Sequence, residues 1–239
     1  SSRVAAEGLI GITIKDNSGA MIEINSETDF VARNELFQNF VKTCSELVLS
    51  SKNNIDALQK LPFPNSNRSV NQELINNIAT IGENMNIRRT EYLEVSKGVL
   101  ISYVHNSVAE GLGRLGVLVA LETGVQNNGI KEIGKQIAMH IAATSPKSLN
   151  IEDLDPEFVE RERQVLIDQA MSSGKPKEIA EKMVQGRMHK FFQEVVLNEQ
   201  ISVIDGETKI KDLIKKTSLE LKNEVKIKGF KVLKLGEGV

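Results

Sequence analysis

The chain has 239 residues, of which 40% are hydrophobic and 26% are charged, with a formal net charge of -2 and a pI near 6.0. This length and apolar content predict a folded protein with a substantial core arranged in two lobes, and they exclude an intrinsically disordered chain. The balanced charge gives no general basic surface, so bulk binding of nucleic acid through phosphate neutralisation is disfavoured.

Targeting signals and cysteines restrict the setting further. No apolar run is long enough to span a bilayer, and the first residues lack the apolar core of a secretory signal peptide. We therefore expect no membrane association, and a place in a bacterial cytoplasm or an organelle matrix. The single cysteine, Cys44, cannot form an internal disulfide, and its place on the apolar stripe of a predicted helix indicates a buried side chain.

The first predicted elements are two antiparallel strands followed by a helix. Apolar residues alternate over residues 10–14 and 21–24, with a turn at 16–19 between them. Over residues 36–48 the spacing becomes that of an amphipathic helix, for which Asn34 is a candidate N-cap. Residues 28–31, Thr-Asp-Phe-Val, therefore lie on a strand-to-helix turn, where rigid elements can hold outward-facing functional side chains.

This order of elements occurs twice. Residues 8–50 and residues 98–144 each read strand, turn, strand, helix, which indicates a duplicated unit. The predicted fold class is α+β, with two similar subdomains that each pack a helix on one face of a small antiparallel sheet.

The predicted first core region spans residues 1–122. It contains an N-terminal subdomain at 8–60, a connecting helix at 70–85 that ends near Gly82, and sheet strands of the second subdomain at 86–122. We assign residues 87–95 to this second sheet as its third strand, and residues 123–155 to its helix.

The remaining chain is predicted to contain an antiparallel helical hairpin at 156–200. Its helices span 156–172 and 176–198, and the Ser-Gly-Lys-Pro sequence at 173–176 supplies a glycine C-cap and a proline that starts the second helix. Because two helices share little core, we expect part of the apolar stripe to meet a partner or a second copy. Residues 201–239 return to the second subdomain and end in an extended segment. Its alternating lysines are expected on the solvent face of an edge strand: Lys226, Lys228, Lys231 and Lys234.

Sequence patterns for enzyme chemistry are weak. Residues 111–116 read G-x-G-x-x-G, but a strand follows where a dinucleotide site needs a helix, so a glycine-rich hairpin loop is predicted. The three histidines, His105, His140 and His189, are scattered without a cysteine cluster and form no metal-ligand set. His140, near a predicted helix end, is expected to be a helix-terminal cation or a packed side chain. The sequence predicts no cofactor and no catalytic residue set.

Two interpretations of residues 28–31 stay open at this point. In the first, Asp29 caps a helix and Phe30 packs beneath its first turn. In the second, Asp29 and Phe30 form an exposed contact, in which the aromatic ring anchors in a partner's pocket and the acid competes for a polar or metal-linked group there.

Five motifs resemble translation elongation factor Ts in the same order and over nearly the whole chain. They are Thr-Asp-Phe-Val-Ala at 28–32, Ile-Gly-Glu-Asn at 81–84, Ile-Arg-Arg at 87–89, Ile-Ala-Met-His at 137–140 and Ser-Gly-Lys-Pro-Lys-Glu-Ile-Ala-Glu-Lys-Met-Val at 173–184. Members of that family have a duplicated α+β core, an inserted helical hairpin and usually an N-terminal three-helix module. The chain opens at the linker after that module, so we expect a piece of a longer protein.

The resemblance implies a function without bond chemistry. Members of the family bind elongation factor Tu, GDP-bound or nucleotide-free, and promote GDP release by disturbing its magnesium and phosphate site; tight binding of the empty form weakens nucleotide binding by linkage. The implied contact residues are Thr28, Asp29, Phe30, Val31, Ile81, Gly82, Asn84 and His140.

Two further expectations concern partners. Self-association through the helical hairpin follows from the resemblance in members that dimerise. An alternative function is an RNA-contacting or scaffolding module of the translation apparatus that uses the Lys226 to Lys234 strand. The acidic balance and the lack of aromatic residues between those lysines argue against it, so no direct nucleic-acid partner is predicted.

Overall fold

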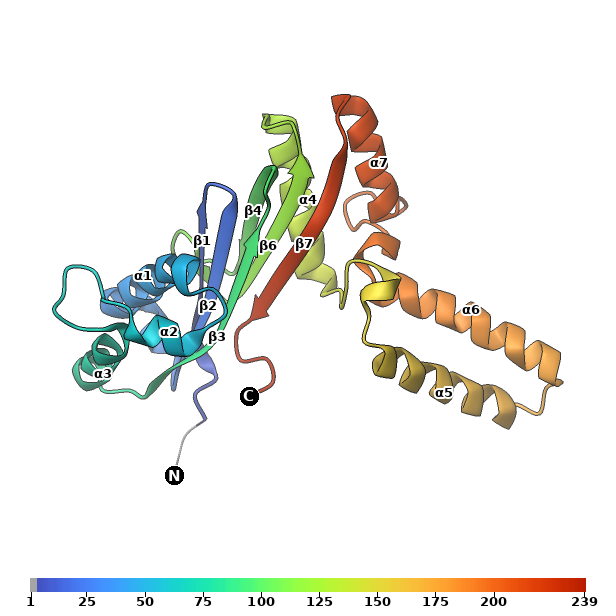
Figure 1. Cartoon of the computed structure of the whole chain (residues 1–239). Coiled ribbons are helices and arrows are strands. Elements are labelled where there is room, and N and C mark those ends of the chain that lie inside the picture. The colour runs from blue at the N-terminus through green and yellow to red at the C-terminus, as the bar shows by residue number, and fades with distance from the viewer. Residues whose placement is uncertain (1–3) are drawn as a thin grey trace. The chain divides into compact units, whose positions relative to one another are not determined.

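The computed structural model describes residues 4–239 and divides the chain into two compact units. One unit comprises the chain up to Ala142 together with Leu221–Val239, and the other is Ala143–Glu220. Over the described range the protein has seven α-helices and two antiparallel sheets, so the predicted α+β class is confirmed (Figure 1). Within that range, no helix is both long and apolar enough to cross a bilayer.

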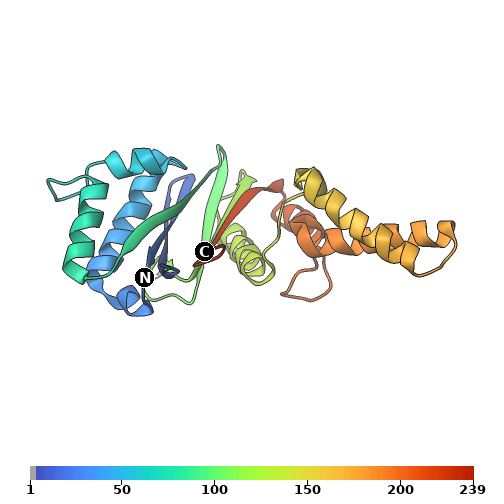
Figure 2. The same cartoon turned by 90° about the horizontal axis from the view of Figure 1, so that it is seen from below.

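The first sheet has four strands in the order β3-β2-β1-β5. The strands are β1 (Glu7–Lys15), β2 (Ser18–Ser26), β3 (Met85–Glu94) and β5 (Leu112–Gly113). One face is covered by α1 (Glu35–Ser51), α2 (Ile55–Lys60) and α3 (Val70–Ile81), as Figure 2 shows. The helix α1 begins where predicted, because the Asn34 side chain accepts a hydrogen bond of 3.1 Å from the Phe37 amide.

The second sheet has three strands in the order β4-β6-β7. They are β4 (Gly98–His105), β6 (Leu115–Thr123) and β7 (Val225–Lys234), and the helix of this half is α4 (Asn128–Thr144). A Cβ added at Gly134 of α4 would lie 2.4 Å from the Ile101 side chain on β4. The glycine therefore permits a close approach of α4 to the sheet.

The two sheets also pack face to face. Ile10, Ile12 and Met21 of the first sheet form one buried cluster with Leu118 and Leu233 of the second. The neighbouring Leu9 instead belongs to the core beneath α1. Strands β1 and β2 are thus buried on both faces, and the alternation of Ile10 and Ile12 marks the face toward the other sheet.

The assignment of residues 87–95 to the second sheet is wrong. These residues form β3, which pairs antiparallel with β2 in the first sheet, while the third strand of the second sheet is β7. Alternation along a strand tells which side chains share a face, but it carries no information about the neighbouring strand. As predicted, β7 is an edge strand, and its Lys226, Lys228 and Lys234 are exposed. Lys231, predicted on the same solvent face, is half-buried.

The two sheets are also alike in how their third strands pair. In each half the second strand pairs with the third through a register shift three residues before its end: between Glu23 and Ile24 in β2, and between Ala120 and Leu121 in β6. The helix before each third strand, α3 or α7 (Ile210–Leu221), is followed by a residue in the left-handed region, Gly82 or Lys222.

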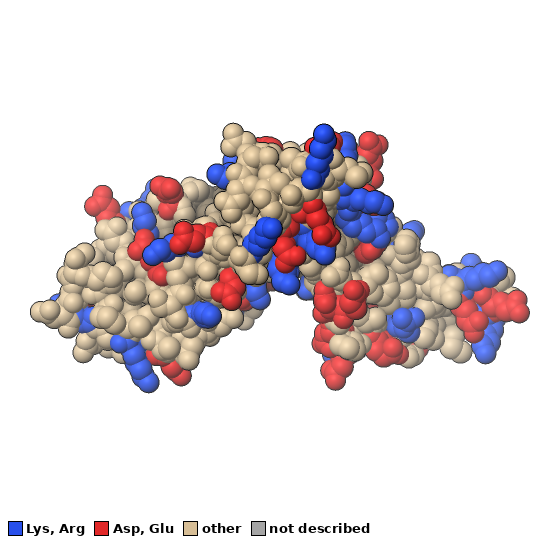
Figure 3. Space-filling model, turned by 45° about the horizontal axis from the view of Figure 1, so that its top comes forward, with Lys and Arg blue, Asp and Glu red and all other residues tan. Residues whose placement is uncertain are grey.

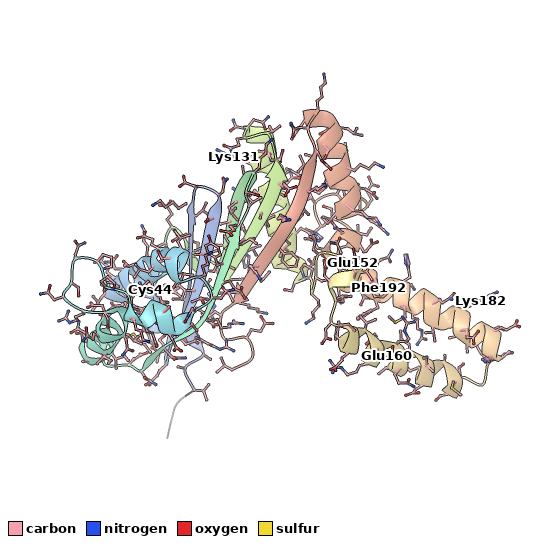
Figure 4. All side chains as sticks on the ribbon, viewed as in Figure 1. Cys44, Lys131, Glu152, Glu160, Lys182 and Phe192 are labelled. Atoms are coloured by element: carbon pink, nitrogen blue, oxygen red, sulfur yellow. The ribbon has the colours of Figure 1, made fainter. Side chains whose placement is uncertain are left out.

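The second unit contains the helices α5 (Pro156–Ser172) and α6 (Lys177–Val195), close to their predicted bounds. Six buried side chains form the cluster between them: Leu166, Ala170, Ala180, Val184, Met188 and Phe191. In Figure 4 the labelled Lys182 lies toward the turn that joins the two helices, and Phe192 lies at the opposite end of α6. Gly174 in that turn has a φ of 70°, as a residue that ends a helix requires.

Candidate protein-contact site

The connection from β2 to α1, residues 27–34, presents an exposed aromatic side chain; we call it the Phe30 turn. It contains a short 3-10 helix, Asp29–Arg33. The Phe30 side chain is 80% exposed, whereas Val31 and Ala32 are buried in the core beneath α1. The interpretation in which Phe30 packs under a helix is therefore wrong, and the capping side chain of α1 is Asn34 rather than Asp29.

Two glutamates tie the Phe30 turn to the end of α3. The Glu83 carboxylate accepts a hydrogen bond of 3.0 Å from the Thr28 amide and a second one from the Thr28 hydroxyl. In return, the Glu27 carboxylate accepts a hydrogen bond of 3.0 Å from the Asn84 amide. Hydrogen bonds to charged groups are stronger than neutral ones, so these crossed bonds fix the two segments against each other.

The end of α3 adds a second exposed segment beside this turn. Gly82 has a φ of 84°, which ends the helix in the left-handed region that favours glycine. A Cβ built there would meet no atom within 4 Å, so the backbone conformation, not crowding, requires the glycine. Asp29, Phe30, Gly82 and Asn84 are exposed on these two bonded segments, and we call them the Phe30 surface.

The remaining predicted contact residues occupy less accessible positions. Thr28 and Ile81 are half-buried, and Ile81 packs against the core beneath α1. Val31 is 4% exposed and His140 in α4 is fully buried. The structure thus brings residues 28–31 and 81–84 together, while Val31 and His140 offer no side-chain surface. The burial of His140 agrees with the interpretation of a packed side chain.

Sequence reasoning missed Glu27 and Glu83, the two residues that hold the site. A signal was present for one of them, because Glu83 lies between Gly82 and Asn84 in a motif already singled out. A carboxylate directly after a glycine-terminated helix can reach backbone amides of a neighbouring turn. The identity of that turn depends on a contact between residues far apart in the chain.

The metal site, the glycine-rich loop and the cysteine are the other candidate features of the sequence. Within residues 4–239, no group of three or more His, Cys, Asp or Glu side chains is arranged to hold a metal ion. The glycine-rich stretch leads into β6, as predicted, and a Cβ at Gly113 would lie 2.4 Å from Val104. Burial, and secondarily the charge of Glu73, raises the pKa of the Cys44 thiol, which makes this residue of α1 unreactive (Figure 4).

Comparison with known proteins gives a consistent result. A family model described as "Elongation factor TS" matches residues 27–237. Proteins named elongation factor Ts are 51% identical in Rhodospirillum centenum and 48% identical in Zymomonas mobilis over 239 residues, and 49% identical in Rhodospirillum rubrum over 240 residues. Each alignment covers all of this chain and 78% of the relative.

Proposed function

The chain belongs to the elongation factor Ts family, and we propose that it is a guanine-nucleotide exchange factor that binds elongation factor Tu, GDP-bound or nucleotide-free, and promotes GDP release. The observation that carries this proposal is the 80% exposure of Phe30 on a turn whose backbone is fixed by two carboxylates. The bacterial relatives support action in a bacterial cytoplasm.

The Phe30 surface supports a direct mechanism. Transfer of the Phe30 ring from water into a pocket of the partner contributes about 1.5 to 3 kcal/mol, which is about tenfold or more in affinity. Because crossed hydrogen bonds already order the turn, binding costs little conformational entropy. The Asp29 carboxylate makes no hydrogen bond or ion pair within the described part of the chain, so it can compete for groups around a bound magnesium ion.

Exchange by this route requires differential binding only. A factor that binds nucleotide-free elongation factor Tu more tightly than the GDP-bound form weakens GDP binding by the same ratio. No covalent bond is made or broken by this chain. The proposed activity is therefore that of an exchange factor rather than of an enzyme in the usual sense.

The RNA-contacting alternative gains no support from β7. Lys226 lies 3.2 Å from Glu224 and Lys231 lies 3.6 Å from Glu91, so two of the four lysines face acidic partners. Figure 3 shows Lys and Arg side chains interspersed with Asp and Glu over the visible face. A phosphate backbone is recognised by a continuous basic surface, and none is visible on that face.

The α5–α6 pair is proposed as a second contact surface, used for self-association. Its exposed apolar side chains include Val165, Met171 and Ile179. A groove of about 590 Å³ near the turn is lined by both helices, including Ile167, Ala180 and Val184. We expect Met171→Glu to weaken any dimer observed by sedimentation velocity. A dimer that persists unchanged would place the self-contact elsewhere.

The test of the main proposal is the release of fluorescent GDP from elongation factor Tu with and without this chain. We expect acceleration by the parent chain and a drop of about tenfold in Phe30→Ala at an unchanged melting temperature. A Leu219→Ala variant, which truncates another exposed side chain, is the matched control. Absence of both binding and acceleration by the parent would reject the proposal; a large fall in melting temperature for Phe30→Ala would contradict the exposed position of the ring.

A further inference from the structure

We propose that a partly buried ion cluster centred on the fully buried Glu23 positions the Phe30 surface for nucleotide exchange. The proposal rests on the proposed function for its effect on exchange, while its effect on the geometry of the Phe30 turn can be measured on this chain alone. The cluster comprises Glu23, Arg88, Arg89, Asn25 and the backbone of residues 234–237.

Glu23 lies on β2, is fully buried and receives four hydrogen bonds. One carboxylate oxygen, Oε1, accepts from Arg88 Nη1 at 3.0 Å and from Arg89 Nε at 2.6 Å. The other oxygen, Oε2, accepts from Asn25 Nδ2 at 3.0 Å and from the Gly236 amide at 2.7 Å. A buried carboxylate is tolerated only when it is paired and hydrogen-bonded in this way.

A β-bulge brings the two arginines to one carboxylate. Successive side chains of a regular strand point to opposite faces of the sheet, so Arg88 and Arg89 would diverge. The pairing of β2 with β3 shifts at this point, because Glu23 is opposite Arg89 and Ile24 is opposite Ile87. The extra residue, Arg88, can then turn toward the same side, as bulges re-aim side chains next to functional sites.

The second half of the duplicated core shows that the bulge does not need the ions. In the second sheet the same shift occurs with Ala120 opposite Gly229 and Leu121 opposite Ile227. An apolar residue therefore occupies the position that corresponds to Glu23. The acidic residue and its arginines are present only in the half that carries Phe30.

The chain beyond β7 completes the cluster. Arg89 Nη2 donates to the Lys234 carbonyl at 2.8 Å, and Arg88 Nη2 donates to the Glu237 carbonyl. Gly236 has a φ of 74°, and a Cβ there would lie 2.7 Å from the Ala6 carbonyl oxygen. Glycine is thus needed for the amide to reach Glu23, and the segment is tied to both β2 and β3.

The cluster and the Phe30 surface are connected through β2 and β3. Glu23 is close to the end of β2 that leads into the Phe30 turn, and Arg88 is close to the start of β3 that follows Asn84. Three residues after Glu23, Ser26 ends β2 and donates a hydrogen bond of 2.9 Å to the Thr28 carbonyl. On the partner strand, Arg88 follows closely after Asn84, whose amide binds Glu27. Fixing the twist of β2 and β3 at the bulge therefore fixes the relative position of the two segments that form the site. Buried ion clusters add little net stability over apolar packing, and fixing one geometry is a use that explains their retention.

The variant that tests this proposal is Glu23→Gln. It preserves the shape of the side chain but replaces one acceptor oxygen with an NH₂ group, so two of the four donors lose their acceptor. The matched control is Glu199→Gln in the other unit, where Glu199 accepts from Lys209 at 3.2 Å and from Lys211 at 2.9 Å. Both variants weaken a partly buried cluster of one carboxylate and two cations.

The first readout is amide hydrogen exchange in the isolated chain. We expect the Thr28 and Asn84 amides to exchange at least about tenfold faster in Glu23→Gln, and at the parent rate in Glu199→Gln. Unchanged exchange at both amides would overturn the proposal, whatever the activity toward elongation factor Tu. If Glu23→Gln does not fold, Arg88→Gln is judged by the same criterion. It removes the Arg88 bonds to Glu23 and to the Glu237 carbonyl and keeps the other three donors to Glu23.

The second readout is coupling with Phe30 in GDP release. We expect Glu23→Gln to slow release by at least about threefold in the parent background and to have no further effect in a Phe30→Ala background, because coupled residues are not additive. Glu199→Gln should have the same effect in both backgrounds. Full additivity of Glu23→Gln and Phe30→Ala would reduce Glu23 to a stabilising residue. If the parent chain does not accelerate GDP release, the proposed function is rejected. The hydrogen-exchange result then decides alone whether the Glu23 cluster positions the Phe30 turn.

Discussion

The two halves of the duplicated core share one backbone frame and differ in the turn that follows the second strand. After β2, the seven residues 27–33 separate Ser26 from the cap residue Asn34; after β6, the three residues 124–126 separate Thr123 from Asn127. Asn127 accepts a hydrogen bond of 3.1 Å from the Ile130 amide, as Asn34 does from Phe37. The longer turn contains the 3-10 helix with Phe30. Because the second half connects its second strand to its helix cap with three residues, the first half does not need the extra residues for its fold.

The hydrogen bonds that hold the two turns also differ between the halves. In the first half Glu83, directly after Gly82, binds Thr28 through both carboxylate oxygens. In the second half Asn223, directly after Lys222, accepts a hydrogen bond of 3.1 Å from the Gly124 amide with one amide oxygen. In both halves, the second residue after the helix that precedes the third strand binds the turn that follows the second strand. In the first half, this residue is a glutamate, and the turn that it binds carries the exposed Phe30 ring.

The largest expected effect comes from giving the first half the short turn of the second. Replacing residues 27–33 with Gly-Val-Gln removes Phe30 and the Glu27 bond, so we expect GDP release to fall to the rate without this chain. The loss of buried Val31 and the loss of the two Thr28 bonds to Glu83 each lower stability by about 1 to 3 kcal/mol. A folded variant is expected because the second half forms its turn with this length. Circular dichroism and GDP release check the two parts. Acceleration that persists in the folded variant would show that the contact lies elsewhere.

The next effect distinguishes the Glu83 bonds of the first half from the Asn223 bond of the second half. Glu83→Ala leaves the Thr28 amide and hydroxyl without their acceptor, and we expect a loss of about 1 to 3 kcal/mol in stability and of about three- to tenfold in exchange rate. Asn223→Ala is the matched change in the second half. It should lower stability by less, about 0.5 to 1.5 kcal/mol, because the bond lost is a neutral one to an exposed amide. It should also leave exchange within about twofold of the parent, as measured by urea denaturation and GDP release. Equal losses of exchange in both variants would remove the distinction between the halves.

Local patterns in the sequence predicted most elements and failed on pairing between distant strands. The alternation over 10–14 and 21–24, the Asn34 cap and the glycine after α3 are local signals, and the structure confirms each. The partner of β3 and the short α2 were not predicted. The first depends on a contact with residues of β2 far away in the chain, and the second spans only six residues.

The candidate site could be predicted in part for the same reason. The turn at 28–31 follows from a switch in periodicity, but periodicity left both interpretations of Phe30 open. The family resemblance favoured the exposed contact, and the ring is 80% exposed. Glu83 and the Glu23 cluster act across long sequence separations, and a buried glutamate on a strand gives no periodic signal. His140 matched a motif, yet the stripe of apolar residues on α4 already indicated burial for neighbouring positions.

A smaller effect is expected at the helix caps. Asn34→Ala and Asn127→Ala each remove a side-chain acceptor at the start of a helix, and each should cost about 1 kcal/mol in urea denaturation. Because Asn34 directly follows the Phe30 turn, we expect only Asn34→Ala to slow GDP release, by about twofold. A greater loss of exchange in Asn127→Ala would mean that the second half contributes the dominant contact.

The smallest effect concerns equivalent buried positions on the two helices, Cys44 on α1 and Ile137 on α4, both fully buried. We expect Cys44→Ala to cost about 1 kcal/mol at pH 7, less than the about 2 to 5 kcal/mol of Ile137→Ala, with exchange unchanged. Burial raises the pKa of the folded Cys44 thiol above its ordinary range, so the unfolded chain alone loses this proton as the pH rises past about 8.5. The contribution of Cys44 to the free energy of unfolding is then complete below that pH and decreases progressively above it. Urea midpoints of parent and Cys44→Ala should therefore converge at about pH 9, where thiol ionisation in the unfolded chain has removed about 1 kcal/mol of the stability. A constant difference between the midpoints would show that the Cys44 thiol ionises equally well in the folded protein and contradict its burial beneath α1.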